Sequence, residues 1–305
     1  MKIAVIGAGA MGSIIGGRLA QAGEDVTLID VWQDNVNAIN SSGLCLEDKT
    51  GNIEQISVKA TTDPAAVGPV DLALVFVKCY HTEEAVRSAA PLIGERTSVM
   101  TLQNGWGNAP RIAAIIGQER LMVGLTYHSG TMIGPGHAKH TGQGMTFMGE
   151  LNGESTDRLN RAAEAFRKAG FEVTVTNEVL KEIWSKLALN VCTLPTSALL
   201  RFTAEKLVEH DGTLDLMRGL LREAVAVANA QGIPISYNER WEAITGLLRK
   251  AVGGKASMLQ DVEKGRQTEI DVINGAIVEA GRRLHIPTPY NDAMVWLVKS
   301  LQETF

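Results

Sequence analysis

The hexapeptide Gly7-Ala8-Gly9-Ala10-Met11-Gly12 directly follows the apolar run Ile3-Ala4-Val5-Ile6. A G-x-G-x-x-G turn between a buried strand and a helix is typical of sites that bind the pyrophosphate of a dinucleotide. Gly7 allows the tight turn, Gly9 lets the backbone approach the phosphates, and Gly12 lets the next helix pack closely on the sheet. The unpaired N–H groups at the start of that helix favour negative charge. We therefore expect residues 7–12 to bind a dinucleotide cofactor.

The residues after this turn have the order that a dinucleotide-binding unit requires. Ser13 to Ala22 has the apolar spacing of a helix, and Asp25 to Ile29 is typical of a second strand. Asp30 ends that strand, 18 residues after Gly12. At this spacing an acidic side chain accepts hydrogen bonds from the ribose hydroxyls of the adenosine half. An ordinary solvated aspartate at a strand end is the alternative.

Length and composition predict a globular protein of two domains. The chain has 305 residues, 45% of them hydrophobic, and a formal net charge of −5. This length exceeds a typical single core. The chain has no basic patch interleaved with aromatic residues, which argues against a nucleic-acid partner, and no apolar stretch long enough for a membrane span. The apolar run near Met1 is too short for a signal peptide, so we expect a cytoplasmic protein.

Cysteine and histidine spacing predicts no metal site. The three cysteines are widely separated, with no C-x-x-C pair: Cys45, Cys79 and Cys192. We expect them to be reduced, and Cys192 to pack as a small hydrophobic residue. Three histidines are expected on the surface of a hairpin and not around a metal: His128, His137 and His140.

Strands and helices alternate along the first half of the chain. Beyond residue 30, apolar runs predict strands at 72–77, 98–102, 121–127 and 171–175. Helical spacing is present at 33–40, 82–92, 111–116 and 156–169. Residues 51–60 are expected to form an antiparallel excursion and residues 134–150 a hairpin. We place a domain boundary near Thr176 and Asn177, so that residues 1–176 form the dinucleotide-binding domain.

From residue 178 onward the chain shows only helical periods, at 178–193, 204–231, 239–252, 256–284 and 289–303. The predicted fold class is α/β, with an N-terminal Rossmann-type doubly wound parallel sheet followed by an all-helical C-terminal domain at residues 177–305. Ligands of doubly wound sheets bind outside the carboxyl ends of the strands. Lys78, Asn104 and Gly105 follow such ends, so we expect them beside the cofactor.

The first helix of the C-terminal domain carries a polar pair. Lys186 and Asn190 are four residues apart, so they share one helix face, which an apolar stripe borders. For Lys186 the alternative is a lysine at the edge of a helix that extends into solvent. A second polar set includes Ser257 and Thr268, where helix capping is the alternative to a binding role.

Several motifs occur together in one order along the chain. They are the N-terminal M-K-I-A-V-I-G-A-G-A-M-G, L-Q-N-G at 102–105, W-S-K-L-A-L-N at 184–190, S-M-L-Q-D at 257–261, T-E-I-D at 268–271 and I-N-G at 273–275. Through these motifs the chain resembles the ketopantoate reductase (2-dehydropantoate 2-reductase) family over essentially its whole length. The resemblance implies a role in pantothenate biosynthesis, with hydride transfer from a nicotinamide to the ketone of a 2-oxo acid bound between two domains.

The resemblance also implies roles for individual residues. Lys186 would be the general acid, and Glu269 a carboxylate that positions cofactor and substrate. Three residues would bind the substrate: Asn104, Asn190 and Ser257. Besides residues 7–12 and Asp30, the residues that line the cofactor would be Lys78, Asn104, Gly130 and Glu269.

The chemistry of ketone reduction agrees with a lysine in this role. Hydride that arrives at a ketone carbon creates an alkoxide, which a cation stabilises and protonates. A lysine with its usual pKa of about 10.4 is protonated at neutral pH. A neighbouring Glu269 would raise the pKa of Lys186, so we expect alkaline conditions to favour the reverse oxidation of the alcohol.

Two positions depart from the family pattern. Many members carry a basic residue at the end of the second strand for the 2′-phosphate of NADP, whereas this chain has Asp30. A carboxylate repels that phosphate, so we expect NAD(H) to be preferred, with NADP(H) as the second cofactor to test. The family helix often continues with an asparagine before the proline, whereas this chain has Thr193-Leu194-Pro195. Leu194 favours a substrate whose tail is less polar than that of ketopantoate or is placed differently.

Two other functions fit parts of the pattern. A 3-hydroxy acid dehydrogenase also combines a glycine turn with a lysine and an asparagine one helical turn apart, but the motifs at 257–261 and 268–271 argue against it. A catalytically silent nucleotide-binding sensor would keep the glycine turn and Asp30, but it would not need Lys186. The long apolar helices of the second domain would also allow a homodimer.

Overall fold

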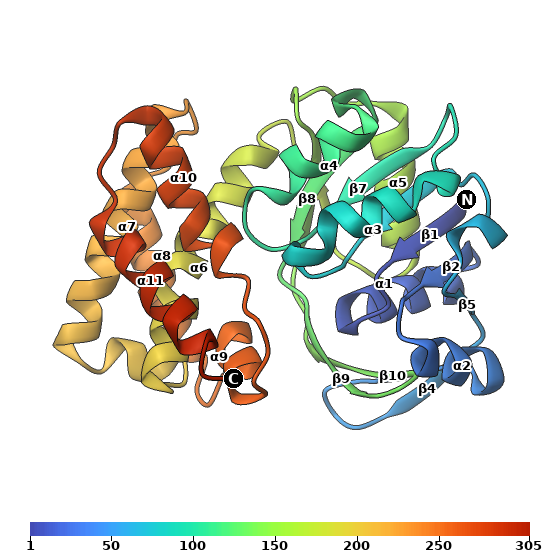
Figure 1. Cartoon of the computed structure of the whole chain (residues 1–305), viewed down its shortest axis with the longest axis horizontal. Coiled ribbons are helices and arrows are strands. Elements are labelled where there is room, and N and C mark those ends of the chain that lie inside the picture. Colours follow the sequence, from blue (N-terminus) through green and yellow to red (C-terminus); the bar gives the residue numbers. More distant parts are fainter. The chain divides into compact units, whose positions relative to one another are not determined.

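The computed structural model describes all 305 residues, which form two compact units (Figure 1). The first unit contains Met1–Gln103 and Asn108–Val179, and the second contains Asn104–Gly107 and Leu180–Phe305. The short segment Asn104–Gly107 therefore packs with the second unit, although its neighbours in the chain belong to the first.

The first unit is built on a sheet of eight strands in the order β12-β11-β8-β7-β6-β1-β2-β5. The strands are β1 (Lys2–Ile6), β2 (Asp25–Ile29), β5 (Lys59–Thr61), β6 (Leu72–Val75), β7 (Ser98–Thr101), β8 (Leu121–Thr126), β11 (Thr146–Glu150) and β12 (Val173–Val175). All neighbours pair in parallel except β8 and β11, which are antiparallel. Ile6 lies opposite both Ile29 and Val75, so β1 is a central strand.

Helices cover both faces of this sheet. They are α1 (Ala10–Gln21), α2 (Gln33–Ser42), α3 (Thr82–Ser88), α4 (Asn108–Ile116) and α5 (Asp157–Lys168), with short 3-10 turns η1 (Pro64–Ala66), η2 (Cys79–His81), η3 (Ala90–Leu92) and η4 (Gln118–Arg120). The connection through α1 runs from β1 to β2, whereas those through α3 and α4 run from β6 toward β8, in the opposite direction along the sheet. Because such crossovers are right-handed, the two sets of helices cover opposite faces. Doubly wound sheets bind ligands where the strand order reverses, which here is beside β1.

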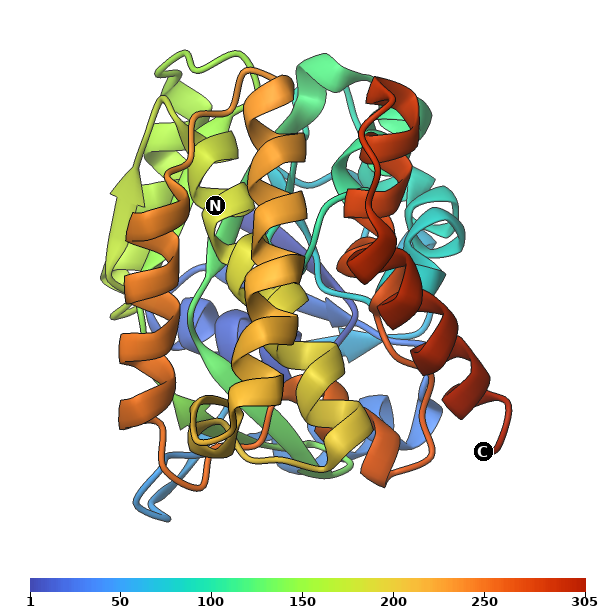
Figure 2. The ribbon, with the colours of Figure 1, turned by 90° about the vertical axis from the view of Figure 1, so that its left-hand side faces the viewer.

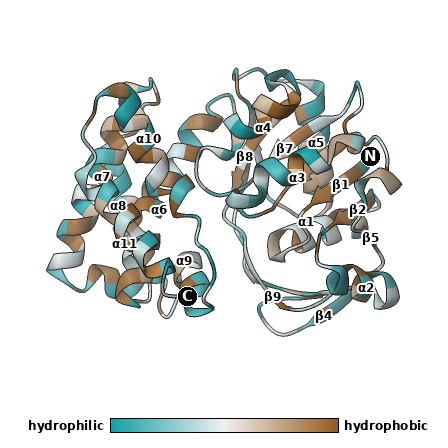
Figure 3. Ribbon diagram, in the orientation of Figure 1, coloured by the Kyte–Doolittle hydropathy of each residue, from teal (hydrophilic) through white to brown (hydrophobic).

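The central strands are continuous apolar runs because helices cover them on both sides. Every residue of β6 and β8 is buried, and the central strands of the large sheet are largely hydrophobic (Figure 3). On α1, Ile14, Ile15 and Leu19 pack in the same core as Val5 and Leu74. The strands predicted at 72–77, 98–102 and 121–127 are confirmed, each slightly shorter than expected.

A second sheet of four strands packs against α1. Its order is β4-β3-β10-β9, with β3 (Leu44–Glu47), β4 (Ile53–Ile56), β9 (Ser129–Gly134) and β10 (His137–Gly142). The pairing predicted for residues 134–150 is wrong: β9 and β10 form the hairpin around Gly136, whose φ is +67°, and β11 joins the large sheet. Within residues 51–60, β4 is antiparallel to β3 as expected, but β5 pairs in parallel with β2.

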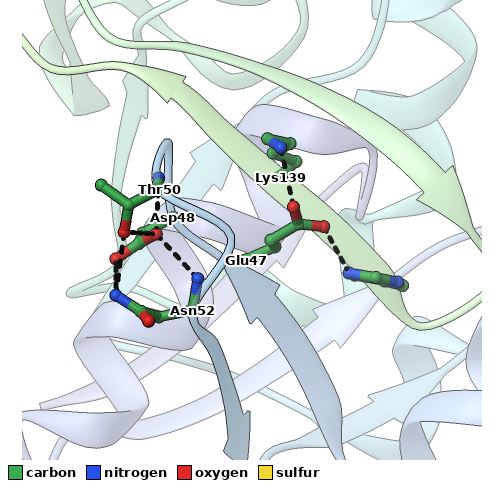
Figure 4. Close-up of polar contacts among 6 residues, drawn as sticks. Glu47, Asp48, Thr50, Asn52 and Lys139 are labelled. Atoms are coloured by element: carbon green, nitrogen blue, oxygen red, sulfur yellow. Dashed lines mark hydrogen bonds and ion pairs between the residues drawn. The ribbon is translucent and has the colours of Figure 1, made fainter.

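Local polar contacts fix the turn between β3 and β4 (Figure 4). The Asp48 carboxylate accepts hydrogen bonds from the backbone N–H groups of Thr50 at 2.8 Å and Asn52 at 3.0 Å, and from both side chains. These hydrogen bonds keep the pKa of the Asp48 carboxyl well below its usual value. On the preceding residue, the Glu47 carboxylate pairs with Lys139 at 2.7 Å, which ties β3 to β10.

The second unit consists of helices (Figure 2, yellow to red). They are α6 (Val179–Leu200), η5 (Glu205–Val208), α7 (Asp211–Ala230), α8 (Tyr237–Lys250), α9 (Ser257–Glu263), η6 (Ile270–Val272), α10 (Asn274–Leu284) and α11 (Pro289–Gln302). A parallel sheet followed by these helices confirms the predicted fold class. No helix is both long and apolar enough to span a lipid bilayer.

Three of the predicted helices have different ends in the structure. The helix predicted at 178–193 continues through Pro195 to Leu200, because packing of its buried apolar residues outweighs the interruption. The stretch with helical spacing at 256–284 is divided: α9 ends at Glu263, the chain turns through Gly265 at φ +60°, and α10 begins at Asn274. The helix predicted at 204–231 is divided into η5 and α7.

Candidate active site

The glycine turn after β1 has the geometry that its three glycines predict. Gly7 adopts φ +98°, and its N–H donates to the carbonyl of Ile29 at 2.8 Å. A Cβ atom on Gly12 would lie 1.9 Å from the carbonyl oxygen of Gly7, so only glycine lets α1 approach this closely. A Cβ atom on Gly9 would meet no protein atom within 4 Å, so the space beside its backbone is open to a ligand.

The start of α1 leaves backbone donors available. The helix begins at Ala10 with Gly9 as its N-cap, and no side chain caps it. Ser13 does not compensate, because its hydroxyl donates to the carbonyl of Ala8 at 2.8 Å. Unpaired N–H groups at a helix N-terminus bind phosphate readily. The turn therefore fits the pyrophosphate of a dinucleotide.

Asn35 fixes Asp30 relative to this turn. The Asp30 carboxylate accepts hydrogen bonds from the N–H of Trp32 at 3.0 Å and from the side-chain amide of Asn35 at 3.3 Å. The same Asn35 amide donates to the carbonyl of Ala8 at 3.1 Å, and Asn35 is fully buried. A carboxylate has room for further hydrogen bonds, so Asp30 can still accept from ribose hydroxyls. No sequence motif marks Asn35, and only its contact with Ala8 reveals this role.

Lys78 and Gly130 both belong to the first unit. Lys78 follows β6 and precedes η2, and it is half-buried. A Cβ atom on Gly130 would lie 2.3 Å from the terminal methyl of the Ile14 side chain, so the close packing of β9 on α1 already favours glycine there. Packing therefore explains Gly130 without a ligand, and its predicted place beside the cofactor stays a prediction.

In the second unit, the side chains of Lys186 and Asn104 form a direct hydrogen bond. Nζ of Lys186 donates to Oδ1 of Asn104 at 2.8 Å, although 82 positions separate the two residues in the sequence. We expected Asn104 at the edge of the sheet, but its segment packs with the helices of the second unit. The proposed substrate ligand Asn104 and the proposed acid Lys186 therefore belong to one site.

Contacts of the next residues hold Asn104 in this place. Gly105 has φ +79°, and a Cβ atom there would lie 2.1 Å from the carbonyl oxygen of Val272. The N–H of Trp106 donates to the same oxygen at 2.8 Å. The Trp106 ring also lies beside the buried ring of Trp184 on α6, with centroids 6.5 Å apart. Residues 104–107 are thus fixed to both η6 and α6.

Burial and charge act in opposite directions on Lys186. Removal from water lowers the pKa of its ammonium group to about 8, and the Glu269 carboxylate raises the pKa by a smaller effect. Glu269 acts in the expected direction, but the expected net increase of the pKa is wrong, because desolvation of the ammonium is the larger effect. A group with this pKa can hold or release a proton near neutral pH.

The two remaining predicted substrate ligands differ in exposure. Asn190 lies one turn after Lys186 on α6 and is 7% exposed. Ser257 is exposed at the start of α9 and makes no capping hydrogen bond, so the capping alternative is wrong for this residue. Thr268 has a structural role instead, because its backbone N–H donates to the Gln302 side chain at 2.7 Å.

No group of three or more potential metal ligands is present. His128 and His140 do lie together, with Nδ1 and Nε2 of their rings 2.9 Å apart. His140 is buried, so its expected place on the surface is wrong, and burial lowers the pKa of His128 to about 4. None of the three cysteines forms a disulfide, and burial raises the pKa of the Cys192 thiol.

Comparison with known proteins supports one family over both units. Models of the ketopantoate reductase PanE/ApbA family match residues 3–153, and models of its C-terminal part match residues 178–302. The 2-dehydropantoate 2-reductase of Pyrococcus horikoshii is 34% identical over 300 residues, which cover 98% of this chain and 97% of the relative. The 2-dehydropantoate 2-reductase of Halobacterium salinarum is 31% identical over 304 residues, 99% of each chain.

Solved structures show the same architecture. A PanE/ApbA family ketopantoate reductase from Ralstonia eutropha JMP134 matches with a TM-score of 0.92 at 34% identity, over 100% of this chain and 99% of that chain. A ternary structure of D-mandelate dehydrogenase with NADH and anilino(oxo)acetate has a TM-score of 0.92 at 27% identity, with the same coverage. The chain therefore belongs to the ketopantoate reductase family, whose members are NAD(P)-dependent oxidoreductases that act on a CH–OH group.

Proposed function

We propose that this protein reduces the ketone of a 2-oxo acid, with ketopantoate as the first substrate to test, and that Lys186 is the general acid. The observation that carries the proposal is the hydrogen bond from Nζ of Lys186 to Oδ1 of Asn104, together with the effect of the Glu269 carboxylate on the same ammonium. Reduction of a ketone needs a proton donor beside the carbonyl oxygen. Lys186 is the cation that donates a hydrogen bond to Asn104 and whose pKa the Glu269 carboxylate raises.

The contacts of Lys186 suit proton transfer to an alkoxide. An ammonium group has three N–H donors and no acceptor. Asn104 accepts one of them through a neutral amide oxygen, which orients the group and leaves its charge in place. In the proposed complex another N–H points to the C2 oxygen of the substrate, and the proton moves to that oxygen as negative charge develops there.

Asn190 and Ser257 are the proposed ligands of the substrate carboxylate. Asn190 shares the helix face of Lys186, so one small molecule can contact both side chains. Ser257 offers a hydroxyl donor from the exposed start of α9. A 2-oxo acid carries its carboxylate next to the ketone, so these donors would orient the carbonyl oxygen toward Lys186.

A nicotinamide cofactor, when bound, supplies the hydride. We propose that residues 7–12 hold its pyrophosphate and Asp30 the ribose of its adenosine half, with Lys78, Asn104, Gly130 and Glu269 as further contacts. NAD(H) is the proposed preference, because the Asp30 carboxylate is anchored by Asn35 and would repel a 2′-phosphate. The NADH complex of D-mandelate dehydrogenase, which has the same fold, supports this preference.

The test of the function is a screen of NADH and NADPH oxidation with a panel of 2-oxo and 3-oxo acids. Lys186→Ala should lower turnover of the 2-oxo acid by roughly 100-fold or more, the loss expected for a positioned acid, while NADH still binds. Lys181→Ala, on the same helix, is the matched control and should turn over normally. Wild-type turnover in Lys186→Ala would show that another group is the acid.

A second candidate substrate is a 2-oxo acid with an apolar tail. Leu194 follows Asn190 by one turn of α6 and is half-buried. The D-mandelate dehydrogenase structure shows that this fold also serves a hydroxy acid with a phenyl group. If Leu194 contacts the tail, Leu194→Asn should change the ratio of kcat/KM for ketopantoate and a phenyl-substituted 2-oxo acid by roughly tenfold in favour of ketopantoate.

A further inference from the structure

Pro195 interrupts the backbone hydrogen bonds of α6 close to the proposed site. The helix carries Lys186 and Asn190 and continues past the proline to Leu200. Proline has no N–H, so it cannot bond the carbonyl four residues earlier, which belongs to Val191. Val191 and Pro195 are both buried. A buried carbonyl without a partner would destabilise the helix at this point.

The side chain of Asn274 supplies the missing donor. Its Nδ2 donates to the carbonyl oxygen of Val191 at 3.1 Å and to Oδ1 of Asn291 at 3.0 Å. Both neighbours are acceptors, so only the amide nitrogen of Asn274 can face them, which settles the orientation of the side chain. Asn274 is fully buried, and its Oδ1 makes no hydrogen bond. The Asn274 side chain therefore contacts its polar neighbours only through the two hydrogen bonds that Nδ2 donates.

Asn291 connects this amide to two further helices. Nδ2 of Asn291 donates to the carboxylate of Glu223 on α7 at 2.7 Å. The same carboxylate accepts the N–H groups of Tyr290 and Asn291 at the start of α11, both at 2.9 Å. A carboxylate is favourable at a helix N-terminus, where backbone donors are unpaired. Asn274 is thus linked through Asn291 to α11, which carries that residue, and to Glu223 on α7.

The stretch of chain that leads to Asn274 also contacts the other parts of the site. Glu269 acts on the ammonium of Lys186. The carbonyl of Val272 holds the segment 104–107 through the backbone bond described above. Asn274 then opens α10 and bonds α6 beside the proline. Residues 269–274 therefore form the common support of the elements that carry the proposed acid and its ligands.

We infer that Asn274 is a positioning residue of this site: its amide replaces the helical bond that Pro195 removes, and it thereby fixes α6 relative to residues 269–274. Asn274 acts through Lys186 and Asn190, so the inference rests on the function proposed for these two residues. The carbonyl that Pro195 leaves without a helical partner belongs to Val191, directly after Asn190, where a small shift of α6 changes the distance from the helix to Glu269. A displacement of about 1 Å at reacting groups can lower a rate by about 100-fold.

The first test compares Asn274→Ala with Asn291→Ala. Both substitutions remove a buried amide from the same network, but only Asn274→Ala leaves the Val191 carbonyl without a partner. We expect Asn274→Ala to lower kcat for reduction of the 2-oxo acid by roughly 10- to 100-fold with an unchanged KM for NADH. Asn291→Ala removes a support of Asn274 but leaves the Val191 carbonyl bonded, so it should lower the Tm and lower kcat much less than Asn274→Ala does. Equal losses of kcat in the two variants would overturn the inference.

Pro195→Ala provides the rescue. Alanine restores an N–H that can bond the Val191 carbonyl within the helix, so the Asn274 amide is no longer required there. In the double variant Pro195→Ala/Asn274→Ala we expect most of the lost kcat to return. A double variant as slow as Asn274→Ala would show that the Val191 carbonyl is not the link, and the inference would fail.

Hydrogen exchange separates this inference from the proposed function. Backbone amides at 186–194 should exchange faster in Asn274→Ala than in the wild type, and they should recover protection in the double variant. If the wild type reduces no 2-oxo acid, the proposed function fails, and the exchange rates alone decide whether Asn274 anchors α6. Unchanged exchange at 186–194 in Asn274→Ala would overturn the anchoring.

Discussion

At the scale of single residues, the role proposed for the Lys186 ammonium group predicts how the reaction should depend on pH. Burial lowers its pKa to about 8. A general acid must carry its proton, so kcat/KM for ketone reduction should be constant below about pH 8 and fall above it. Oxidation of the alcohol needs the neutral amine, so its rate should rise up to the same pH and then level off. The measurement is the pH profile of kcat/KM for reduction and for oxidation. A rate of reduction that does not change up to about pH 10 would contradict the lowered pKa of Lys186.

Glu269 provides a control for the pH profile. Its carboxylate raises the pKa of Lys186, so Glu269→Gln should lower that pKa and move the fall in reductive rate to a lower pH. Glu263→Gln changes an exposed carboxylate on α9 that pairs with Lys255, and it should leave the profile in place. A shift in the opposite direction for Glu269→Gln would exclude the assigned role of its charge.

Asp30 is the residue that should set cofactor preference. Its carboxylate is bonded to Asn35 and Trp32, and an asparagine in its place would keep the shape and remove the charge. Asp30→Asn should therefore raise kcat/KM with NADPH relative to NADH by roughly tenfold, which corresponds to about 1.4 kcal/mol. The measurement is a pair of initial-rate series at a fixed concentration of substrate. Wild-type enzyme that uses NADPH as well as NADH would refute the preference.

At the scale of elements, two glycines of one turn should respond differently to alanine. Gly12→Ala places a Cβ atom 1.9 Å from the Gly7 carbonyl oxygen, so α1 must move, at a cost of about 1–3 kcal/mol in the free energy of unfolding. Gly9→Ala meets no protein atom, so the apoprotein should melt normally while the Kd for NADH rises. Thermal melting and NADH titration of both variants test this, and normal NADH binding by Gly9→Ala would place the pyrophosphate elsewhere.

The elements also show where sequence patterns suffice and where they do not. The run Leu72–Val75 is apolar because both faces are covered, so its pattern predicts a buried strand directly. Gly265 signals the end of α9, but helical spacing continues up to residue 284 and does not show where the next helix begins. In the stretch between the two helices, the Thr268 N–H donates to the side chain of Gln302, far along the chain. The bond between Lys186 and Asn104 likewise depends on long-range packing at Gly105. The net pKa of a lysine depends on burial, which spacing does not report.

At the scale of the whole molecule, the chain enters the second unit more than once. It does so at Asn104–Gly107, returns to the first unit, and enters the second again after Val179. The first entry is held by the bond from Trp106 to Val272. Neither unit can therefore be cut from the sequence as one continuous piece. Residues 104–107 are fixed in the second unit, and the chain on both sides of them belongs to the first unit. Unfolding of one unit would therefore disturb the other, and we expect a single cooperative transition for the whole chain.

Cofactor binding offers a test of that cooperativity, because the residues proposed to hold the pyrophosphate and the adenosine ribose belong to the first unit, whereas most of the tryptophans belong to the second. Trp32 is in the first unit, and the other tryptophans are in the second: Trp106, Trp184, Trp241 and Trp296. NAD⁺ at 100 times its Kd should add about 2.7 kcal/mol to the free energy of unfolding. If the units unfold together, tryptophan fluorescence and far-UV circular dichroism should give one Tm that NAD⁺ raises equally in both signals. A Tm from tryptophan fluorescence that NAD⁺ does not change would mean that the second unit melts independently and that the segment 104–107 does not couple the two units.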